Sequence, residues 1–178
     1  MTPLQVLSYY NAIANNGVMM KPKFVRMITD KSSVVEEYDY EVIDDRICSE
    51  RTAKDAQKLL EAVVEYGTAS NLRKSDYKIA GKTGTARIAQ TNHTGGSSYG
   101  DKHTYQASFA GYFPADNPMY SCIVVVNAPN RSNYYASHVA GPIFEEIADK
   151  VYACLLYTSD AADDMQCVDL GGRRIIKK

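Results

Sequence analysis

The chain has 178 residues, of which 45% are hydrophobic, and this is enough apolar material for one core but not for two large domains. Its formal net charge of −1 gives no electrostatic basis for binding an acidic polymer or membrane surface, so nucleic acid is not expected as a partner. No apolar run approaches the roughly 20 residues that a membrane-spanning helix needs, so we expect any anchor or targeting segment to lie outside these residues.

The first element is predicted to be a helix that begins at about Pro3. Thr2 can cap this helix with Gln5 reaching back to it, and proline suits the first helical turn. Asn16-Gly17 has the chemistry of a helix end. These signals predict a helix from about Pro3 to Asn16.

Short β-segments are expected next, at residues 24–28 and as a strand pair around residues 34–43. Ser49 is placed to cap a second helix, which Gly67 ends. Its apolar residues recur at helical spacing and form one face that we expect to pack on a following sheet: Ala53, Ala56, Leu60, Val63 and Val64.

That sheet is predicted to contain three strands, at residues 77–87, 105–112 and 120–127. The second and third strands are joined by a segment with two prolines and an Asp-Asn pair, which is turn chemistry and predicts an antiparallel pair. The loop at residues 90–104 is long for a hairpin, and such loops are more often functional or mobile than idle. The expected fold class is α+β, with an antiparallel sheet packed with helices.

A last helix is predicted from Gly141-Pro142 to about Ala153, with Ile143 and Phe144 among the residues facing the sheet. Residues 154–178 are expected to be an unstructured, artefactual tail. The stretch from Cys154 onwards is what the codons TGT CTC TTA TAC ACA TCT encode, and these resemble a transposon end used in sequencing-library preparation. The alternative is a genuine C-terminal helix with a basic end.

No metal site or cofactor is expected. Without the tail, the remaining cysteines are Cys48 and Cys122, whose spacing is not that of a metal site. The three histidines are also scattered without ligand spacing: His93, His103 and His138.

The most informative residues are Lys82-Thr83-Gly84. They follow a short apolar run and continue into Thr85-Ala86, so the motif is predicted to lie on a strand. One alternative is an ordinary half-solvated strand. Another is a nucleotide-binding P-loop ending at Thr83, but that motif needs a glycine where Asp76 stands, and an acidic side chain there would repel phosphate.

Lys-Thr-Gly is one of three signatures of the penicillin-binding proteins and serine β-lactamases. Around it, several further segments occur in the same order as in class B penicillin-binding proteins: Thr2-Pro-Leu-Gln5, Ala14-Asn-Asn-Gly-Val18, Gly111-Tyr-Phe-Pro-Ala115 and Ala140-Gly-Pro-Ile-Phe144. Residues 1–153 therefore resemble the C-terminal part of that transpeptidase domain, with its β-lactamase/transpeptidase-like fold. Within the class they are most similar to the cell-division transpeptidases, often called penicillin-binding protein 3, and the elongation-specific relatives share most of these segments.

The resemblance implies a peptidoglycan D,D-transpeptidase that cross-links stem peptides through a serine acyl-enzyme and binds β-lactam antibiotics. Lys82 and Thr85 would be catalytic, Lys82 assisting proton transfer and the Thr85 backbone N–H stabilising the oxyanion. Thr83, Gly84 and Thr85 would bind substrate, the two hydroxyls contacting its carboxylate. The implied partners are stem peptides, β-lactams and membrane proteins of cell division. The implied location is the cell inner membrane, with the catalytic domain periplasmic or extracytoplasmic.

The sequence departs from the family in one respect. It contains no Ser-x-Asn, and its one Ser-x-x-Lys, beginning at Ser75, lies directly before the Lys-Thr-Gly strand, where no separate helix fits. We read Ser75 as a turn residue, expect the nucleophile to be absent, and expect the chain to be inactive alone. The alternative function is a β-lactam-binding sensor domain of the same fold, against which the Thr2-Pro-Leu-Gln5 helix argues.

Overall fold

The computed structural model describes residues 1–31, 33–74, 76–88, 104–130 and 132–160. The predicted functional loop at 90–104, the turn residue Ser75 and most of the expected tail lie wholly or largely outside these residues. The chain divides into two units, Met1–Phe144 and Glu145–Lys178, and the first of them contains all the described strands.

The elements are, in chain order, α1 (Pro3–Ala14), β1 (Met19–Met20), β2 (Met27–Asp30), β3 (Ser33–Glu37), β4 (Val42–Asp44), α2 (Glu50–Glu65), η1 (Ser70–Leu72), β5 (Ala80–Ile88), β6 (Thr104–Phe113), β7 (Tyr120–Asn127) and α3 (Ala136–Asp160). The boundary between the two units falls within α3, so only its part up to Phe144 is described with the sheet. Helices and antiparallel sheets together confirm the predicted α+β class.

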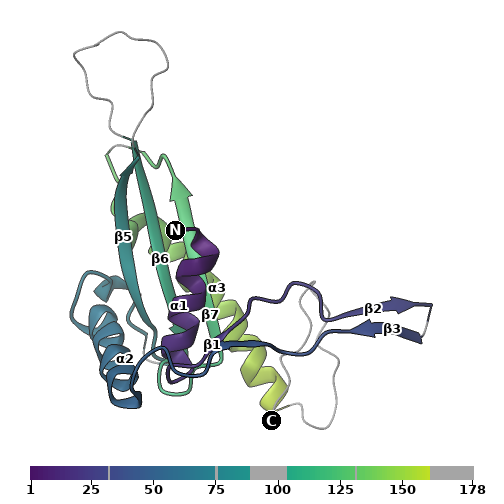
Figure 1. Ribbon diagram of the computed structural model, residues 1–178. Helices are drawn as coiled ribbons and strands as arrows, with labels where there is room; N and C mark the ends of the chain where they lie inside the picture. The colour runs from purple at the N-terminus through teal and green to yellow at the C-terminus, as the bar shows by residue number, and fades with distance from the viewer. Residues whose placement is uncertain (32, 75, 89–103, 131, 161–178) are drawn as a thin grey trace, which may run out of the picture. The chain divides into compact units, whose positions relative to one another are not determined.

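The main sheet contains three antiparallel strands in the order β5-β6-β7 (Figure 1). Its register pairs Thr83 of β5 with Phe109 of β6, and Phe109 in turn with Val124 of β7. The predicted three strands and their antiparallel pairing are therefore confirmed. In the described part of the chain β5 is an edge strand, because β6 is its one partner.

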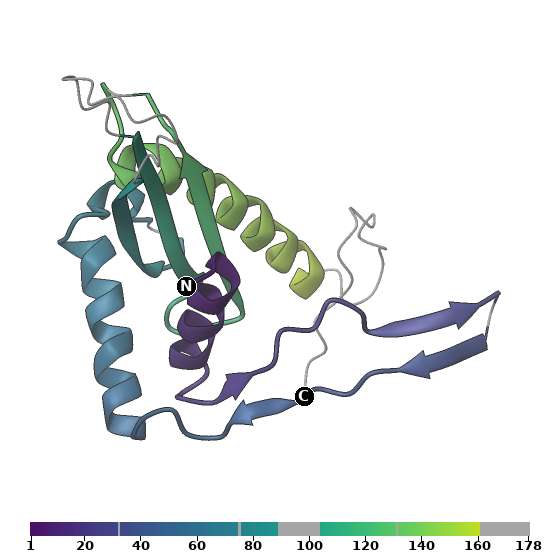
Figure 2. The ribbon, with the colours of Figure 1, turned by 45° about the horizontal axis from the view of Figure 1, so that its top comes forward.

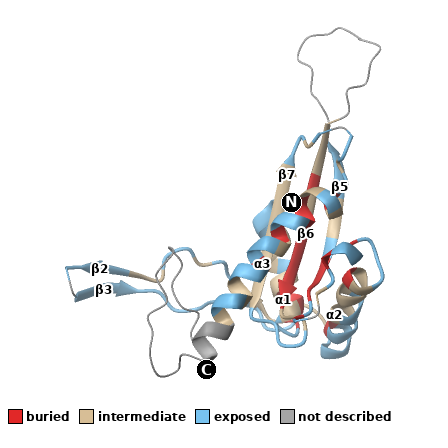
Figure 3. Cartoon of the chain, turned by 180° about the vertical axis from the view of Figure 1, so that it is seen from behind, coloured by how far each residue is buried: buried red, intermediate tan, exposed pale blue. Residues whose placement is uncertain are grey.

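The two faces of this sheet are covered by different helices. On one face Phe109 and Phe113 pack against Phe144 of α3, with ring centroids 4.7 and 5.7 Å apart and edge-to-face geometry. On the other face α1 crosses β6 and β7 (Figure 1), and Asn11 Nδ2 donates to Ser121 Oγ at 3.2 Å. Buried residues accordingly concentrate along the central strand β6 (Figure 3).

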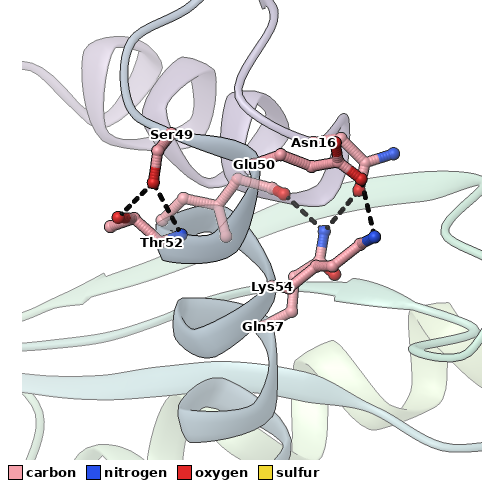
Figure 4. Close-up of polar contacts among 7 residues, drawn as sticks. Asn16, Ser49, Glu50, Thr52, Lys54 and Gln57 are labelled. Atoms are coloured by element: carbon pink, nitrogen blue, oxygen red, sulfur yellow. Dashed lines mark hydrogen bonds and ion pairs between the residues drawn. The ribbon is translucent and has the colours of Figure 1, made fainter.

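The start of each of the first two helices follows the predicted capping chemistry. At α1 the Gln5 N–H donates to Thr2 Oγ1 and the Gln5 side chain accepts from the Thr2 N–H, a complete capping box. At α2, Ser49 Oγ accepts from the Thr52 N–H at 3.1 Å (Figure 4). Gln57 Nε2 donates to the Ile13 carbonyl at 2.7 Å, which ties α2 to the end of α1.

The predicted apolar face of α2 is buried to different degrees. Ala53 and Val64 are buried, whereas Ala56, Leu60 and Val63 are half-buried. The helix ends at Glu65 with Tyr66 as its cap, next to Gly67 as predicted, and a side chain at Gly67 would lie 2.9 Å from the Val63 backbone, so glycine is needed at this position.

The pairing predicted within residues 34–43 is wrong. The strand β3 pairs with β2, and β4 pairs with β1, so the two strands of this segment have different partners. The reason is the turn position: Lys31 adopts a positive φ of 53° and Ser33 Oγ donates to the Asp30 carbonyl, which closes a hairpin before residue 34. Figures 1 and 2 show this hairpin apart from the three-stranded sheet, and every residue of β3 is exposed.

The last helix also differs from its prediction. It begins at Ala136, before Gly141-Pro142, because the His138 and Val139 N–H groups both donate to the Tyr135 carbonyl and open the first turn there. Pro142 therefore lies inside the helix. Phe144 is buried as predicted, but Ile143 is 44% exposed. The helix continues past Ala153 to Asp160, so residues 154–160 are helical and not unstructured.

Candidate functional site

The predicted site residues lie together on β5. Lys82 and Thr85 are exposed, and Thr83 and Gly84 are half-buried. Because β5 is an edge strand of the described sheet, its outer row of backbone groups is not used by a neighbouring strand there. Such an edge is the geometry onto which an extended peptide can add.

Strand alternation separates the four residues into two pairs. Thr83 and Thr85 lie opposite Phe109 and Ala107, on the face that α3 covers, whereas Lys82 and Gly84 lie opposite Ala110 and Ser108. The two threonine hydroxyls are therefore on one face, as the sequence predicts.

Each of these hydroxyls has a defined neighbour. Thr83 Oγ1 lies 2.9 Å from Thr68 Oγ1, and Lys82 Nζ donates to the Thr83 carbonyl at 3.0 Å and to Thr83 Oγ1 at 3.2 Å. Thr85 Oγ1 accepts from the Ala136 N–H at 3.4 Å. Ala136 is the first residue of α3, where helical N–H groups lack intrahelical partners and carry partial positive charge. An ammonium, two hydroxyls and a helix start thus combine into a site suited to an anion.

The two glycines of this strand serve different purposes. A Cβ at Gly81 would lie 2.6 Å from the Ala110 carbonyl oxygen and 2.7 Å from the Phe109 ring, so glycine is required for the sheet to pack. A Cβ at Gly84 would lie 2.6 Å from Ser108 Oγ, a hydroxyl that can rotate away. Gly84 therefore leaves no side chain projecting from the Lys82 face of the strand, and it is not required for packing of the core.

Three tyrosines extend the site and were not predicted. Tyr105 stacks on Tyr134 with ring centroids 4.1 Å apart, and Tyr134 stacks on Tyr135 at 4.7 Å. Tyr105 is the register partner of Arg87, two residues beyond Thr85 on β5. Hydrogen bonding with Tyr135 raises the pKa of the Tyr134 hydroxyl. The sequence signal was the Tyr-Tyr pair shortly before the last helix.

The structure also decides one alternative. A P-loop places its Gly-Lys-Thr in a loop that opens a helix, whereas Gly81-Lys82-Thr83 lies inside β5, so that interpretation is wrong.

In the described residues no three His, Cys, Asp or Glu side chains are grouped to hold a metal ion. Among the helices that the structure describes, none combines the length and apolar character that crossing a bilayer requires.

Comparison with known proteins gives consistent results. Residues 1–149 match the family described as "Penicillin binding protein transpeptidase domain". The chain is 36% identical over 157 residues to penicillin-binding protein PbpB of Mycolicibacterium smegmatis, covering 83% of this chain and 23% of that protein. It is 29% identical over 151 residues to peptidoglycan D,D-transpeptidase FtsI of Buchnera aphidicola, covering 84% and 24%.

A solved structure of penicillin-binding protein 3 from Mycobacterium tuberculosis, complexed with aztreonam, superposes with a TM-score of 0.70 at 31% identity, covering 94% of this chain and 37% of that one. This likeness confirms the expected transpeptidase-like fold and the resemblance to penicillin-binding protein 3. The chain spans about a quarter of the length of the curated relatives it matches. On its edge-strand motif, its fold and these matches, the chain belongs to the penicillin-binding protein transpeptidase domain family.

Proposed function

We propose that this chain forms the substrate-binding edge of a peptidoglycan D,D-transpeptidase that works through a serine acyl-enzyme and binds β-lactams. The observation that carries the proposal is the edge strand β5, on which Lys82 Nζ donates to the Thr83 hydroxyl and the Thr85 hydroxyl accepts from the Ala136 N–H at the start of α3. The names of two relatives, a D,D-transpeptidase and a penicillin-binding protein, support the same reaction class.

In this reaction a serine Oγ attacks the penultimate D-Ala carbonyl of one stem peptide, and terminal D-Ala leaves. An amine of a neighbouring peptide then takes the acyl group and frees the serine. The terminal carboxylate, or that of a β-lactam, would accept hydrogen bonds from Thr83 and Thr85. Lys82 would assist proton transfer, the Thr85 N–H would bind the oxyanion, and Gly84 would let the peptide lie close to the strand.

The tyrosine cluster of Tyr105, Tyr134 and Tyr135 would border the same site on the α3 side. Its stacked rings present an apolar surface with polar hydroxyl tips. We assign it to contacts with the non-reacting part of the stem peptide or antibiotic, because such contacts favour binding without altering the reacting groups.

The proposal also covers the residues that complete the enzyme. The nucleophile would come from outside the 178 residues, because Ser-x-Asn is missing and Ser75 directly precedes β5, so the chain alone would not react with penicillin. Residues 1–153 would form the domain and 154–178 an adapter-derived tail. The complete protein would be held in the cell inner membrane with this domain periplasmic or extracytoplasmic, among cell-division membrane proteins.

Acylation by a fluorescent penicillin tests the proposal in the full-length protein that carries these residues. Lys82→Ala should slow acylation by about 100-fold or more, the scale seen when a preorganised electrostatic group is removed from an acyl-transfer site. Lys54→Ala is a matched control, because Lys54 is exposed on α2 and paired with Glu50. Release of D-Ala from a stem-peptide analogue separates a transpeptidase from a β-lactam sensor. A Lys82→Ala protein that acylates at the parental rate, or labelling of Ser75 in the isolated chain, contradicts the assignment.

A further inference from the structure

The hydrogen bond between Thr68 and Thr83 joins the segment after α2 to the candidate carboxylate-binding strand. The two hydroxyl oxygens are 2.9 Å apart, fifteen residues apart in sequence. Thr68 is followed by Ala69 and Leu72, both completely buried, and the Ala69 N–H donates to the Val63 carbonyl at 3.2 Å. The Thr68 backbone is therefore held by its surroundings, and its hydroxyl is presented to Thr83 from a fixed position.

The same segment also holds the start of α3. Asn71 Nδ2 donates to the Ser137 carbonyl at 2.8 Å, and the Leu72 side chain lies where it would contact a Cβ at Gly141, at 3.2 Å. The Ala136 N–H, at the start of α3, donates to Thr85 Oγ1. Residues 68–72 therefore contact Thr83 directly, through Thr68, and also hold the helix start that contacts Thr85.

Hydrogen-bond counting fixes the direction of the Thr68–Thr83 bond when an anion is present. A threonine hydroxyl has one proton and two lone pairs. At Thr83 one lone pair accepts from Lys82 Nζ. If Thr68 donates to the other, the Thr83 proton is left for a ligand, whereas the reverse direction uses that proton within the protein. A carboxylate can only accept, so its binding selects the arrangement in which Thr68 donates.

Thr85 has the equivalent arrangement. Its oxygen accepts from the Ala136 N–H, which leaves its own proton for a ligand. Both hydroxyls would then accept from the protein and donate to the same anion. Donation into each hydroxyl also strengthens its outward bond, because hydrogen bonds in a chain polarise one another.

We propose that Thr68 is a positioning residue, which directs the Thr83 proton toward the carboxylate of stem peptide or β-lactam by donating its own. The inference rests on the proposed function, because it assigns a partner to a hydroxyl of that site. Thr68 does not contact the reacting atoms and acts through Thr83.

The test compares acylation of the full-length protein by benzylpenicillin and by its methyl ester, which lacks the anionic group. Thr68→Val removes the hydroxyl at nearly constant shape and should lower the benzylpenicillin rate constant about five-fold, the typical net effect of one hydrogen bond, with the ester rate unchanged. Thr68→Ser keeps the hydroxyl and should restore the parental ratio of the two rates. Thr29→Val, at an exposed position of β2, controls for the chemistry of the substitution.

Each outcome bears on one claim. If Thr68→Val lowers the benzylpenicillin and ester rates by the same factor, Thr68 only supports the fold. The positioning role is also overturned if neither rate falls, or if Thr68→Ser does not recover the parental ratio. Lys82→Ala separates this failure from failure of the proposed function: if it slows acylation by the expected factor of about 100 or more while Thr68→Val does not alter the ratio, the site stands and the role of Thr68 does not.

Discussion

Replacing Phe144 by alanine tests whether the aromatic contact between α3 and β6 is the main support of the sheet. Phe144 is completely buried, and its ring meets Phe109 and Phe113 edge to face at 4.7 and 5.7 Å. Truncating a buried phenylalanine costs about 3–5 kcal/mol of unfolding free energy, including the cavity that remains. Each lost aromatic pair is worth about 0.5–1.5 kcal/mol beyond buried area, which favours the upper part of that range.

We therefore expect Phe144→Ala to lower the unfolding free energy by about 4–5 kcal/mol. For a chain of this length the thermal midpoint should fall by about 8–20 °C. Equilibrium urea unfolding of the 178-residue chain, followed by circular dichroism, gives the free energy directly, provided that the slope with denaturant stays constant.

The matched control is Ile143→Ala, one residue earlier on the same helix. Ile143 is 44% exposed, so its truncation should cost at most about 1.5 kcal/mol. The reasoning is refuted if Phe144→Ala costs no more than this control, because the two rings of β6 would then be supported without α3.

Three further predictions concern stability. Tyr112 has a buried hydroxyl without a hydrogen-bond partner among the described residues, so Tyr112→Phe should be at least as stable as the parent at pH 7 by urea unfolding. Burial, and secondarily the charge of Glu61, raises the Tyr112 pKa above its ordinary 10.0. Above pH 10 the folded parent therefore binds more protons than the unfolded chain, and its unfolding free energy should fall by up to about 1.4 kcal/mol per pH unit. Tyr112→Phe should lack this fall. Gly81→Ala should cost about 1–3 kcal/mol because its Cβ meets backbone and ring, and Gly84→Ala distinctly less; equal costs in thermal melts would contradict the different packing of the two glycines. Removing residues 154–178 should leave the thermal midpoint unchanged, and a drop of several degrees would show that these residues belong to the fold.

Features set by neighbouring residues were predictable from the sequence. The Thr2–Gln5 capping box and the Gly67 helix end depend on contacts within one turn, and the β6–β7 pairing follows from a short proline-containing connection. The placement of Lys82 and both threonines followed in the same way, because the alternation of a strand fixes which side chains share a face.

Features set by distant residues were not predictable in this way. The partners of β3 and β4 depend on where the chain turns: the turn at Lys31 comes before β3, so β3 pairs with β2 and leaves β4 to pair with β1. Thr68 and the tyrosine pair Tyr105 and Tyr134 lie at the site because separate elements contact one another there. Contacts between distant elements leave no periodic pattern in the sequence from which they could be predicted. Helix rules placed Pro142 in a first turn, whereas the hydrogen bonds to the Tyr135 carbonyl start the helix earlier.

The hairpin of β2 and β3 has a consequence for how this chain loses structure. All of β3 is exposed, and a two-stranded ribbon that buries so little is only marginally stable in water. Its ladder should open without the sheet that carries Lys82, so that its amide hydrogens exchange with solvent at a free-energy cost well below that of global unfolding. A protease that cuts within residues 27–37 would accordingly act on the native population and leave the three-stranded sheet paired.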